Sequence, residues 1–452
     1  MIASSISNID DGTLLARAAL GRLYVLSTRR HFGVNGCRRE VTRRALWQTA
    51  RMTTMIRAIR DDEVSAFRAA LMTVFGGDAD DDPNGDARFR QLVACEQAWA
   101  AFDGPHIVAT AASYNMEIAI PGGTLPIAGL TQVTVRPTHR RRGLLRALIG
   151  HHLDDAKARG FAASGLWASQ ASIYRRFGYG LAASHDHVEI VSAHSVNFID
   201  GGTRDDVAWI DEAEARAAMP AIYATATAGR PGAVRRTEVW WRERRFLEAP
   251  FIRAGASRRR HVLALRAGVP VGYVSYRQRG GFDTGQPSGK LEIIELIGID
   301  APAEATLWQF VMRADLFPTV IWSNAPSDMV LPWLVDDWRS VQRTRGDNIW
   351  LRIDDVAAAL ARRRYQNDGT LCINVDGVTW ELTVRDGIGQ CVLSTKKPDI
   401  TLDQATLSSL YLGSVPAHQL AAAGWIVGNA TAIASTDRIM AWPVAAWCAE
   451  IF

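Results

Sequence analysis

The alternation of apolar and polar residues is clearest in the stretch TQVTVRPTHRRRGLLRALIG. Val133 and Val135 alternate with polar neighbours, which predicts a half-buried strand. Pro137 ends this strand, because proline has no N–H to donate to a strand partner. The apolar residues of LLRALI then recur with helical spacing. We therefore predict a strand, a short basic turn and a helix.

The rest of the chain predicts helices and strands throughout, so the fold class is α+β. Residues 88–101 are predicted as a helix, and residues 107–114 and 116–121 as two strands of a meander. The polar, glycine-rich residues 281–289 are predicted as a loop. Two Asp-Gly dipeptides within residues 369–394 separate β-rich runs and predict tight hairpin turns.

The basic turn before the first of these helices has the composition of an anion site. Arg140, Arg141 and Arg142 are followed by Gly143. The first turn of a helix has unpaired N–H groups and the positive end of the helix dipole. Glycine has no Cβ, so an anion can approach the backbone closely, and nearby arginines can bind phosphate oxygens. The alternative is an ordinary basic helix start exposed to solvent.

This turn is where the chain resembles a known family. The pattern V-x-V-x-P-x-x-R-R-x-G resembles the acetyl-CoA pyrophosphate loop of the GNAT acetyltransferase superfamily, and VTVRPTHRRRGLL resembles its Eis branch of aminoglycoside-type N-acetyltransferases. Leu145 replaces the small residue of the broad superfamily pattern, but the Eis branch tolerates leucine there. The resemblance implies that acetyl-CoA is the co-substrate and contacts Val133, Thr134, Val135, Arg140, Arg141, Arg142, Gly143, Leu144, Leu145 and Ser169.

A second segment, SQASIYRRFGYG, resembles the other hallmark of this family. Tyr174 follows the strand that ends near Trp167, and in this fold that strand diverges from the Val133 strand to leave room for the pantetheine arm. Tyr174 is interpreted as the general acid, since a phenol pKa of about 10 exceeds a thiol pKa of about 8.5. The alternative is an ordinary core aromatic, which is our interpretation of Phe177 and Tyr179.

The last six residues, WCAEIF, are unusually apolar for a chain end. In Eis-like enzymes the carboxylate of a terminal phenylalanine faces the substrate amine, and Phe452 matches that position. Because amines are mostly protonated at neutral pH, transfer requires a base. An α-carboxylate has a pKa of about 3.5 and is ionised there, so Phe452 is interpreted as the general base. A hydrophobic end that only packs on a core is the alternative, and it is compatible with this role.

We divide the 452 residues into four segments. Residues 1–51 form a basic extension, 52–195 a catalytic GNAT domain, 196–345 a second GNAT-like domain, and 346–452 an α+β domain resembling sterol carrier protein. Sterol binding does not follow from that resemblance.

The second GNAT-like domain differs from the first at the turn that corresponds to the predicted pyrophosphate loop. Where the first has RRRGLL, the second has DAPAE, beginning at Asp300 and ending at Glu304. Carboxylates there would repel a pyrophosphate, so this domain is predicted not to bind CoA.

The charge of the chain is unevenly distributed. Residues 1–51 contain nine arginines and three acidic residues, a balance of 9 − 3 = +6, so the total of +4 leaves 4 − 6 = −2 for the rest. A slightly acidic body suits a cationic amine better than nucleic acid. The extension could be a transit sequence, a nucleic-acid arm or, as we favour, a non-essential segment upstream of a start at Met52 or Met55.

Other features exclude further classes of protein. There is no run of 18 apolar residues, so no membrane span is predicted. The five cysteines are odd in number and lack metal-type spacing, which predicts a reducing compartment without disulfides. We predict no metal site, since the histidines have no ligand pattern: His151, His152, His185 and His187.

Together these patterns predict an acetyl-CoA-dependent N-acetyltransferase that acts by direct attack on polycationic amines such as aminoglycosides, or on lysine side chains. The alternative is a non-catalytic CoA-binding regulatory protein. We predict a cytoplasmic location, with secretion left open, and a small-molecule amine as partner. The family resemblance implies a homo-oligomer, a hexamer.

Overall fold

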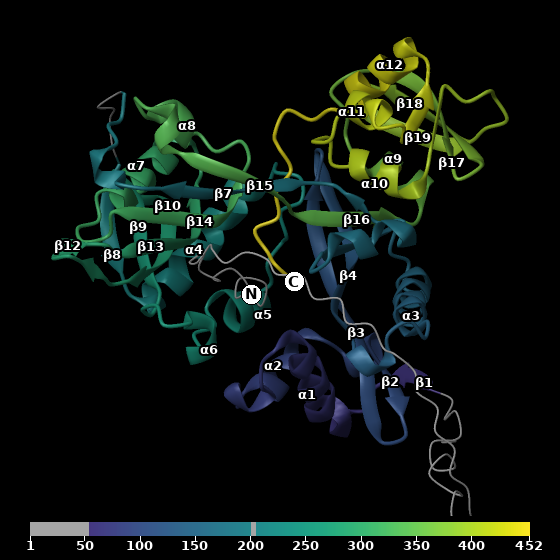
Figure 1. The fold of residues 1–452 in the computed structure, drawn as a ribbon. Helices are drawn as coiled ribbons and strands as arrows, with labels where there is room; N and C mark the ends of the chain where they lie inside the picture. The colour runs from purple at the N-terminus through teal and green to yellow at the C-terminus, as the bar shows by residue number, and fades with distance from the viewer. Residues whose placement is uncertain (1–53, 200–204) are drawn as a thin grey trace, which may run out of the picture.

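The computed structural model describes residues 54–199 and 205–452, which form three lobes (Figure 1). The predicted basic extension, residues 1–51, lies outside the described residues. None of the helices within the described ranges is both long and apolar enough to cross a membrane. Helices and strands occur in every lobe, so the α+β class is confirmed.

The first lobe is built on a seven-stranded sheet of order β1-β2-β3-β4-β5-β16-β6. Its strands are β1 (Met55–Ala58), β2 (Ala98–Asp103), β3 (His106–Ile120), β4 (Gly123–Val135), β5 (Ala163–Trp167), β16 (Ile349–Ile353) and β6 (Gly180–Leu181). Its helices are α1 (Val64–Phe75), α2 (Gly85–Leu92) and α3 (Leu144–Ala158). The predicted strand, turn and helix are confirmed by β4 and α3.

Two predictions in this lobe are wrong. The helix predicted over 88–101 ends at Leu92, and the chain enters β2 at Ala98. The alanines of β2 favour a helix locally, but they are fully buried inside the sheet, and tertiary packing decides their conformation. The two strands predicted around Asn115 are one strand, β3, because exposed Asn115 still pairs with Ala128 of β4.

The second lobe has a seven-stranded sheet of order β15-β7-β14-β13-β10-β9-β8. These strands are β15 (Gln342–Asp347), β7 (Ser184–Ile190), β14 (Thr319–Pro326), β13 (Lys290–Gly298), β10 (Val269–Arg279), β9 (Arg260–Arg266) and β8 (Asp206–Ile210). The accompanying helices are α4 (Glu212–Thr227), α5 (Glu238–Trp240), α6 (Pro250–Arg253), α7 (Ala301–Met312) and α8 (Leu331–Leu334). The loop predicted over 281–289 contains a short hairpin, β11 (Phe282–Asp283) and β12 (Gln286–Pro287).

The first two lobes exchange strands. β7 follows β6 of the first sheet in the chain but pairs with β14 and β15 of the second. β16 follows β15 of the second sheet but pairs with β5 and β6 of the first. The boundary predicted at residue 195 therefore falls after a strand that already belongs to the second sheet, and the division into domains stays a prediction.

The third lobe contains a five-stranded sheet of order β19-β18-β17-β20-β21. Its strands are β17 (Gly369–Val375), β18 (Val378–Arg385), β19 (Ile388–Leu393), β20 (Ile400–Leu402) and β21 (Ile426–Gly428). Its helices are α9 (Val356–Arg362), α10 (Gln404–Leu410), α11 (Ala417–Ala422) and α12 (Ala430–Met440). Both predicted Asp-Gly turns are confirmed, with positive φ at each residue, as a type I′ hairpin requires.

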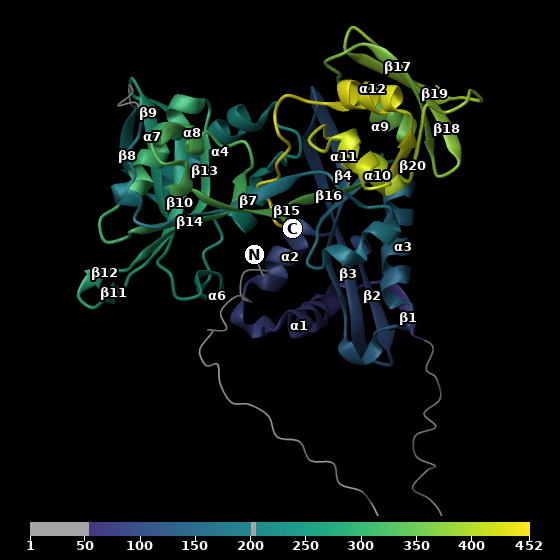
Figure 2. The same ribbon diagram turned by 45° about the horizontal axis from the view of Figure 1, so that its top comes forward.

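After α12 the chain leaves the third lobe as an extended tail, residues 441–452. Figures 1 and 2 show this yellow tail running into the space between the first and second lobes, where the chain ends. The C-terminal residue is therefore far in sequence from β4 but close to it in space.

Candidate active site

The central feature of the site is the point where β4 and β5 separate. Their parallel pairing runs from Ile127 with Ala163 to Gly129 with Gly165. β4 continues to Val135, and over that last part its partner in the described structure is β3. The predicted divergence of these two strands is confirmed. It leaves one edge of β4 open toward the start of α3.

The turn between β4 and α3 is open and cationic. Gly143 is the N-cap of α3 and has a φ of 83°, a left-handed conformation that favours glycine. A Cβ built there would meet no atom within 4 Å, so space remains over the helix N-terminus. Arg140, Arg141 and Arg142 are exposed around it, and Arg142 donates to the carbonyl of Thr138 at 3.0 Å. This arrangement fits a diphosphate.

Tyr174 follows the 3₁₀ turn Ala171–Ile173 and is 5% exposed. It belongs to a buried apolar cluster that includes Leu130 of β4 and Leu144 of α3. Burial raises the pKa of Tyr174 to about 12, although a hydrogen bond with Ser169 opposes this shift. The phenol therefore keeps its proton at neutral pH.

The other two aromatic residues of this segment have structural contacts. Tyr179 is fully buried, and its hydroxyl forms a 2.6 Å hydrogen bond with the hydroxyl of Ser164. Ser164 in turn forms a 2.7 Å hydrogen bond with Nε2 of His152. Phe177 is partly buried against the same apolar cluster as Tyr174. These contacts agree with our interpretation of Phe177 and Tyr179 as core residues.

The terminal residue, Phe452, packs against β4. Its side chain is 9% exposed, and a Cβ built on Gly129 would lie 3.4 Å from its Cε2. The same Cβ would collide with the sulfur of Met116 on β3, so a larger residue at 129 would first displace the Met116 side chain. Phe452 thus lies beside the last residue of β4 that pairs with β5.

The two predicted catalytic residues approach the divergence from different faces of the sheet. Successive strand residues point to opposite faces. Gly129 faces Met116 and Phe452, whereas Leu130 packs in the cluster that contains Tyr174. Tyr174 therefore shares a buried cluster with Leu130, the neighbour in sequence of Gly129, which the chain end contacts.

Several polar residues that sequence reasoning missed bind the tail. Asn348 accepts from the backbone N–H of Cys448 at 2.8 Å and donates to its carbonyl at 3.0 Å, as a strand partner would. Arg244 donates to the carbonyl of Ile451 and, at 3.2 Å, to the hydroxyl of Tyr114. The only sequence signal was Glu450, a single charge inside an apolar terminus.

The corresponding helix start in the second lobe is closed. The carboxylate of Asp300 caps α7 by accepting from the N–H of Ala303 at 3.0 Å. The same carboxylate pairs with Arg266 at 2.8 Å. An anion at this helix start would have to displace a carboxylate that already caps it, which agrees with the prediction that this lobe does not bind CoA.

Comparison with known proteins identifies the family. Residues 55–182 and 232–353 each match a family described as an acetyltransferase (GNAT) domain, and residues 356–449 match a sterol carrier protein domain. N-acetyltransferase Eis of Mycobacterium bovis is 32% identical over 372 residues, which is 78% of this chain and 88% of Eis. The chain belongs to the Eis-like GNAT N-acetyltransferases.

Other relatives agree with this Eis-like assignment. An uncharacterized N-acetyltransferase of Streptomyces avermitilis is 33% identical over 384 residues, covering 82% of this chain and 93% of the relative. The crystal structure of Eis1 from Mycobacterium abscessus matches 88% of this chain and all of its own, with a TM-score of 0.76 and 29% identity. An Anabaena variabilis N-acetyltransferase with a TM-score of 0.75 and 20% identity shares the fold. The predicted family, N-acetyltransferase activity and order of two GNAT folds before a sterol-carrier-like domain are confirmed.

Proposed function

We propose that this Eis-like enzyme uses acetyl-CoA to acetylate amines of polycationic small molecules such as aminoglycosides, or lysine side chains. The observation that carries the proposal is the convergence of three features on the divergence of β4 and β5. These are the open arginine-glycine turn at Gly143, the buried phenol of Tyr174 and the chain end at Phe452.

The donor would be held by the residues of the first lobe. Acetyl-CoA supplies the acetyl group as a thioester. Arg140, Arg141 and Arg142 and the N–H groups at the start of α3 would bind its diphosphate. The free edge of β4 near Val133 would pair with the pantetheine arm, and an N–H there would polarise the thioester carbonyl. The other proposed contacts are Thr134, Val135, Leu144, Leu145 and Ser169.

The transfer needs one base and one acid. The carboxylate of Phe452 would take the proton from the acceptor amine, directly or through water. The amine nitrogen then bonds to the acetyl carbon, the carbon–sulfur bond breaks, and Tyr174 gives its proton to the leaving thiolate. Its pKa of about 12 keeps that proton available at neutral pH. Both groups are restored by exchange with solvent, and no covalent enzyme intermediate forms.

The acceptor class follows from the resemblance of the two motifs to the Eis branch. The structure adds one restriction, because the guanidinium of Arg244 contacts the carbonyl of Ile451 next to the proposed base. Further ammonium groups of a polycationic acceptor would therefore be oriented away from Arg244. A hexameric assembly is also a proposal from family resemblance, and native mass spectrometry would test it. A cytoplasmic location is a proposal from the scattered cysteines.

The decisive experiment incubates the enzyme with acetyl-CoA and a panel of aminoglycosides, polyamines and lysine peptides. Release of free CoA and acetylation of the acceptor are measured, the latter by mass spectrometry. Acceptor-dependent release supports the proposal. Tight CoA binding without release would favour the non-catalytic alternative.

A further inference from the structure

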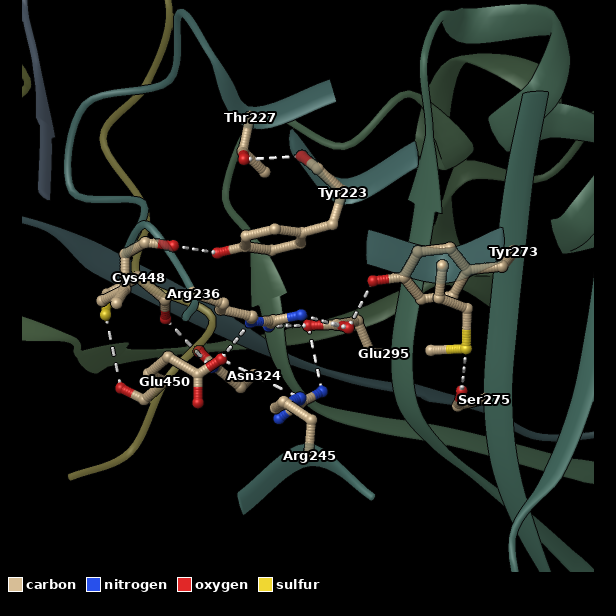
Figure 3. Close-up of polar contacts among 12 residues, drawn as sticks. Tyr223, Thr227, Arg236, Arg245, Tyr273, Ser275, Glu295, Asn324, Cys448 and Glu450 are labelled. Carbon is tan, nitrogen blue, oxygen red and sulfur yellow. Dashed lines mark hydrogen bonds and ion pairs between the residues drawn. The ribbon is translucent and has the colours of Figure 1, made fainter. Parts of the chain in front are cut away.

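A cluster of four charged side chains, three buried and one partly buried, joins the tail to the second lobe; it contains two arginines and two glutamates. Arg236 is 0% exposed, Glu295 1%, Glu450 2% and Arg245 13%. Three of them, Arg236, Arg245 and Glu295, belong to the second lobe, and Glu450 belongs to the tail. We call these four residues the tail clamp; Figure 3 shows Arg236 between the two carboxylates.

Arg236 joins the two carboxylates of the tail clamp. Its Nε lies 2.5 Å from Oε1 of Glu450, and its two terminal nitrogens lie 3.0 and 2.5 Å from the oxygens of Glu295. Arg245 lies 3.0 Å from Glu295 and 3.8 Å from Glu450. Tyr273 donates to Glu295 at 2.6 Å. Every charge in the cluster therefore has an oppositely charged partner.

Aromatic rings fix the plane of the central guanidinium. The Cζ of Arg236 lies 3.6 Å from the ring centroid of Tyr223 and 4.6 Å from that of Trp241. A planar guanidinium stacked on aromatic faces has little freedom to reorient. The position of Glu450 is therefore set by a rigid group of the second lobe.

Each charged group of the tail clamp favours the ionised form of its oppositely charged neighbours. Burial opposes ionisation of Glu450, but the charges of Arg236 and Arg245 outweigh it and hold the pKa of this carboxyl below its usual value. Replacing a buried cluster of charges by apolar residues of similar volume often leaves the folded state equally stable or more stable. The contribution of the tail clamp to folding stability therefore does not explain why the protein contains it. The geometry suggests a different use, because Glu450 lies two residues before the proposed base.

A widened helical turn directs two neighbouring arginines to the end of the tail. The π-helix Trp241–Arg245 contains both Arg244, which donates to the carbonyl of Ile451, and Arg245 of the tail clamp. Turns of this type occur frequently at functional sites. The second lobe thus contacts the tail at both residues that precede Phe452.

We propose that the second lobe, through the tail clamp, positions the terminal carboxylate of Phe452 for catalysis, with Arg236 as the main positioning residue. This inference rests on the proposed function of Phe452 as base. An extended chain rises about 3.3 Å per residue, so only a short segment separates Glu450 from the carboxylate. A displacement of Glu450 would therefore displace the terminal carboxylate of Phe452 by a similar distance.

The test combines substitutions in the tail clamp with removal of Phe452. Arg236→Lys keeps the charge but cannot bind both carboxylates in the same way, and Glu450→Gln keeps the shape but loses the charge. Both are expected to lower kcat about 10- to 100-fold, as misplacement of a reacting group does, while KM for acetyl-CoA stays unchanged. Glu212→Gln, which breaks an exposed ion pair with Arg216 on α4, is the matched control and should leave kcat unchanged.

The same substitutions are then made in a chain that ends at Ile451. If the tail clamp acts through Phe452, Arg236→Lys causes no further loss of kcat there, because the two changes are coupled. Equal losses in both backgrounds would overturn the tail-clamp proposal while leaving the base in place. Removal of Phe452 without loss of kcat would instead overturn the proposed base, and the tail-clamp proposal with it.

A second readout does not depend on turnover. Carboxypeptidase releases a terminal phenylalanine only when the chain end leaves its site, and the released amino acid is measured by chromatography. Glu450→Gln and, as a milder change in the same cluster, Arg245→Lys should release Phe452 at least several-fold faster than Glu212→Gln, under conditions where circular dichroism shows all three folded. Release at the same rate would overturn the proposal.

Discussion

Phe452 packs against Gly129, the residue at which the pairing between β4 and β5 ends. A Cβ on Gly129 would lie 3.4 Å from Cε2 of Phe452, which is van der Waals contact distance. The contact joins the last residue of the chain to the opening in the first sheet. It is the structural basis for expecting the terminal carboxylate to act on a group held in that opening.

The open turn at the start of α3 can be tested with a pair of glycines. Gly143 and Gly160 have φ values of 83° and 75°, and a Cβ on either would meet no atom within 4 Å. Gly143→Ala and Gly160→Ala should each cost about 1 kcal/mol of stability, from the left-handed backbone. Only Gly143→Ala should raise KM for acetyl-CoA, by about tenfold, which corresponds to 1.4 kcal/mol. A similar KM for both variants in steady-state assays would contradict the phosphate role.

Substitution of Tyr174 should affect the chemical step. Tyr174→Phe removes the proposed acid and is expected to lower kcat about 100-fold, with little change in either KM. Tyr179→Phe is the matched control, because Tyr179 is also a buried tyrosine but its hydroxyl bonds Ser164. That variant should lose about 1 kcal/mol of stability and keep its kcat. Equal kcat values for the two variants would contradict the assignment of Tyr174 as the general acid.

Displacing the terminal carboxylate should lower kcat more than changing the terminal ring does. One glycine added after Phe452 displaces the carboxylate by about 3.3 Å and should reduce kcat about 100-fold. Phe452→Leu keeps a carboxylate at the same position and an apolar contact with Gly129, so most of kcat should remain. Steady-state kinetics with a saturating acceptor measures kcat for both variants. A larger loss of kcat in Phe452→Leu than in the extended chain would show that the ring, and not the carboxylate, is needed.

Lowering the pH should reduce the free energy of unfolding of the first lobe through His152. Burial, with smaller contributions from Arg159 and Arg352, lowers the pKa of His152 to about 3. In the unfolded chain this imidazole binds a proton near pH 6.5, so between pH 6.5 and 3 the unfolded state holds the extra proton and stability falls as pH falls. From pH 7 to pH 5 the loss amounts to about 2 kcal/mol.

His152→Gln should remove this part of the acid sensitivity. The comparison is the change in melting temperature between pH 7 and pH 5, measured by calorimetry for both proteins. His261, whose pKa burial lowers to about 4, is present in both and cancels. A wild-type protein no more acid-sensitive than His152→Gln would show that His152 is already protonable in the folded state.

Local patterns explain which parts of the fold the sequence could predict. β4, the turn and α3 were predictable because the alternation around Val133, the break at Pro137 and the glycine at 143 all act within a few residues. The Asp-Gly hairpins of the third lobe were predictable for the same reason. The strand at Ala98 was not, because alanine favours a helix locally and only burial inside the sheet determines its conformation.

The parts of the site that could not be predicted depend on contacts between distant segments. Glu450 has the only charged side chain of the tail, 441–452, but nothing in the sequence around it identifies Arg236 as its partner. Asn348 likewise acts as a backbone partner of Cys448, a relationship that requires the third lobe to return the chain to the first two. Such contacts follow from the path of the chain, which residue patterns alone do not reveal.

The exchange of β7 and β16 between the first two sheets has a consequence for synthesis in the cell. The first sheet must wait for β16, which leaves the ribosome only after the entire second lobe has been translated. The strands of the second sheet all lie between residues 184 and 347, so that sheet is fully translated before β16. A nascent chain stopped before residue 349 would therefore hold an unfinished first sheet beside a complete second set of strands. Chaperones would then meet the first lobe, although it is translated first, as the later of the two to be completed.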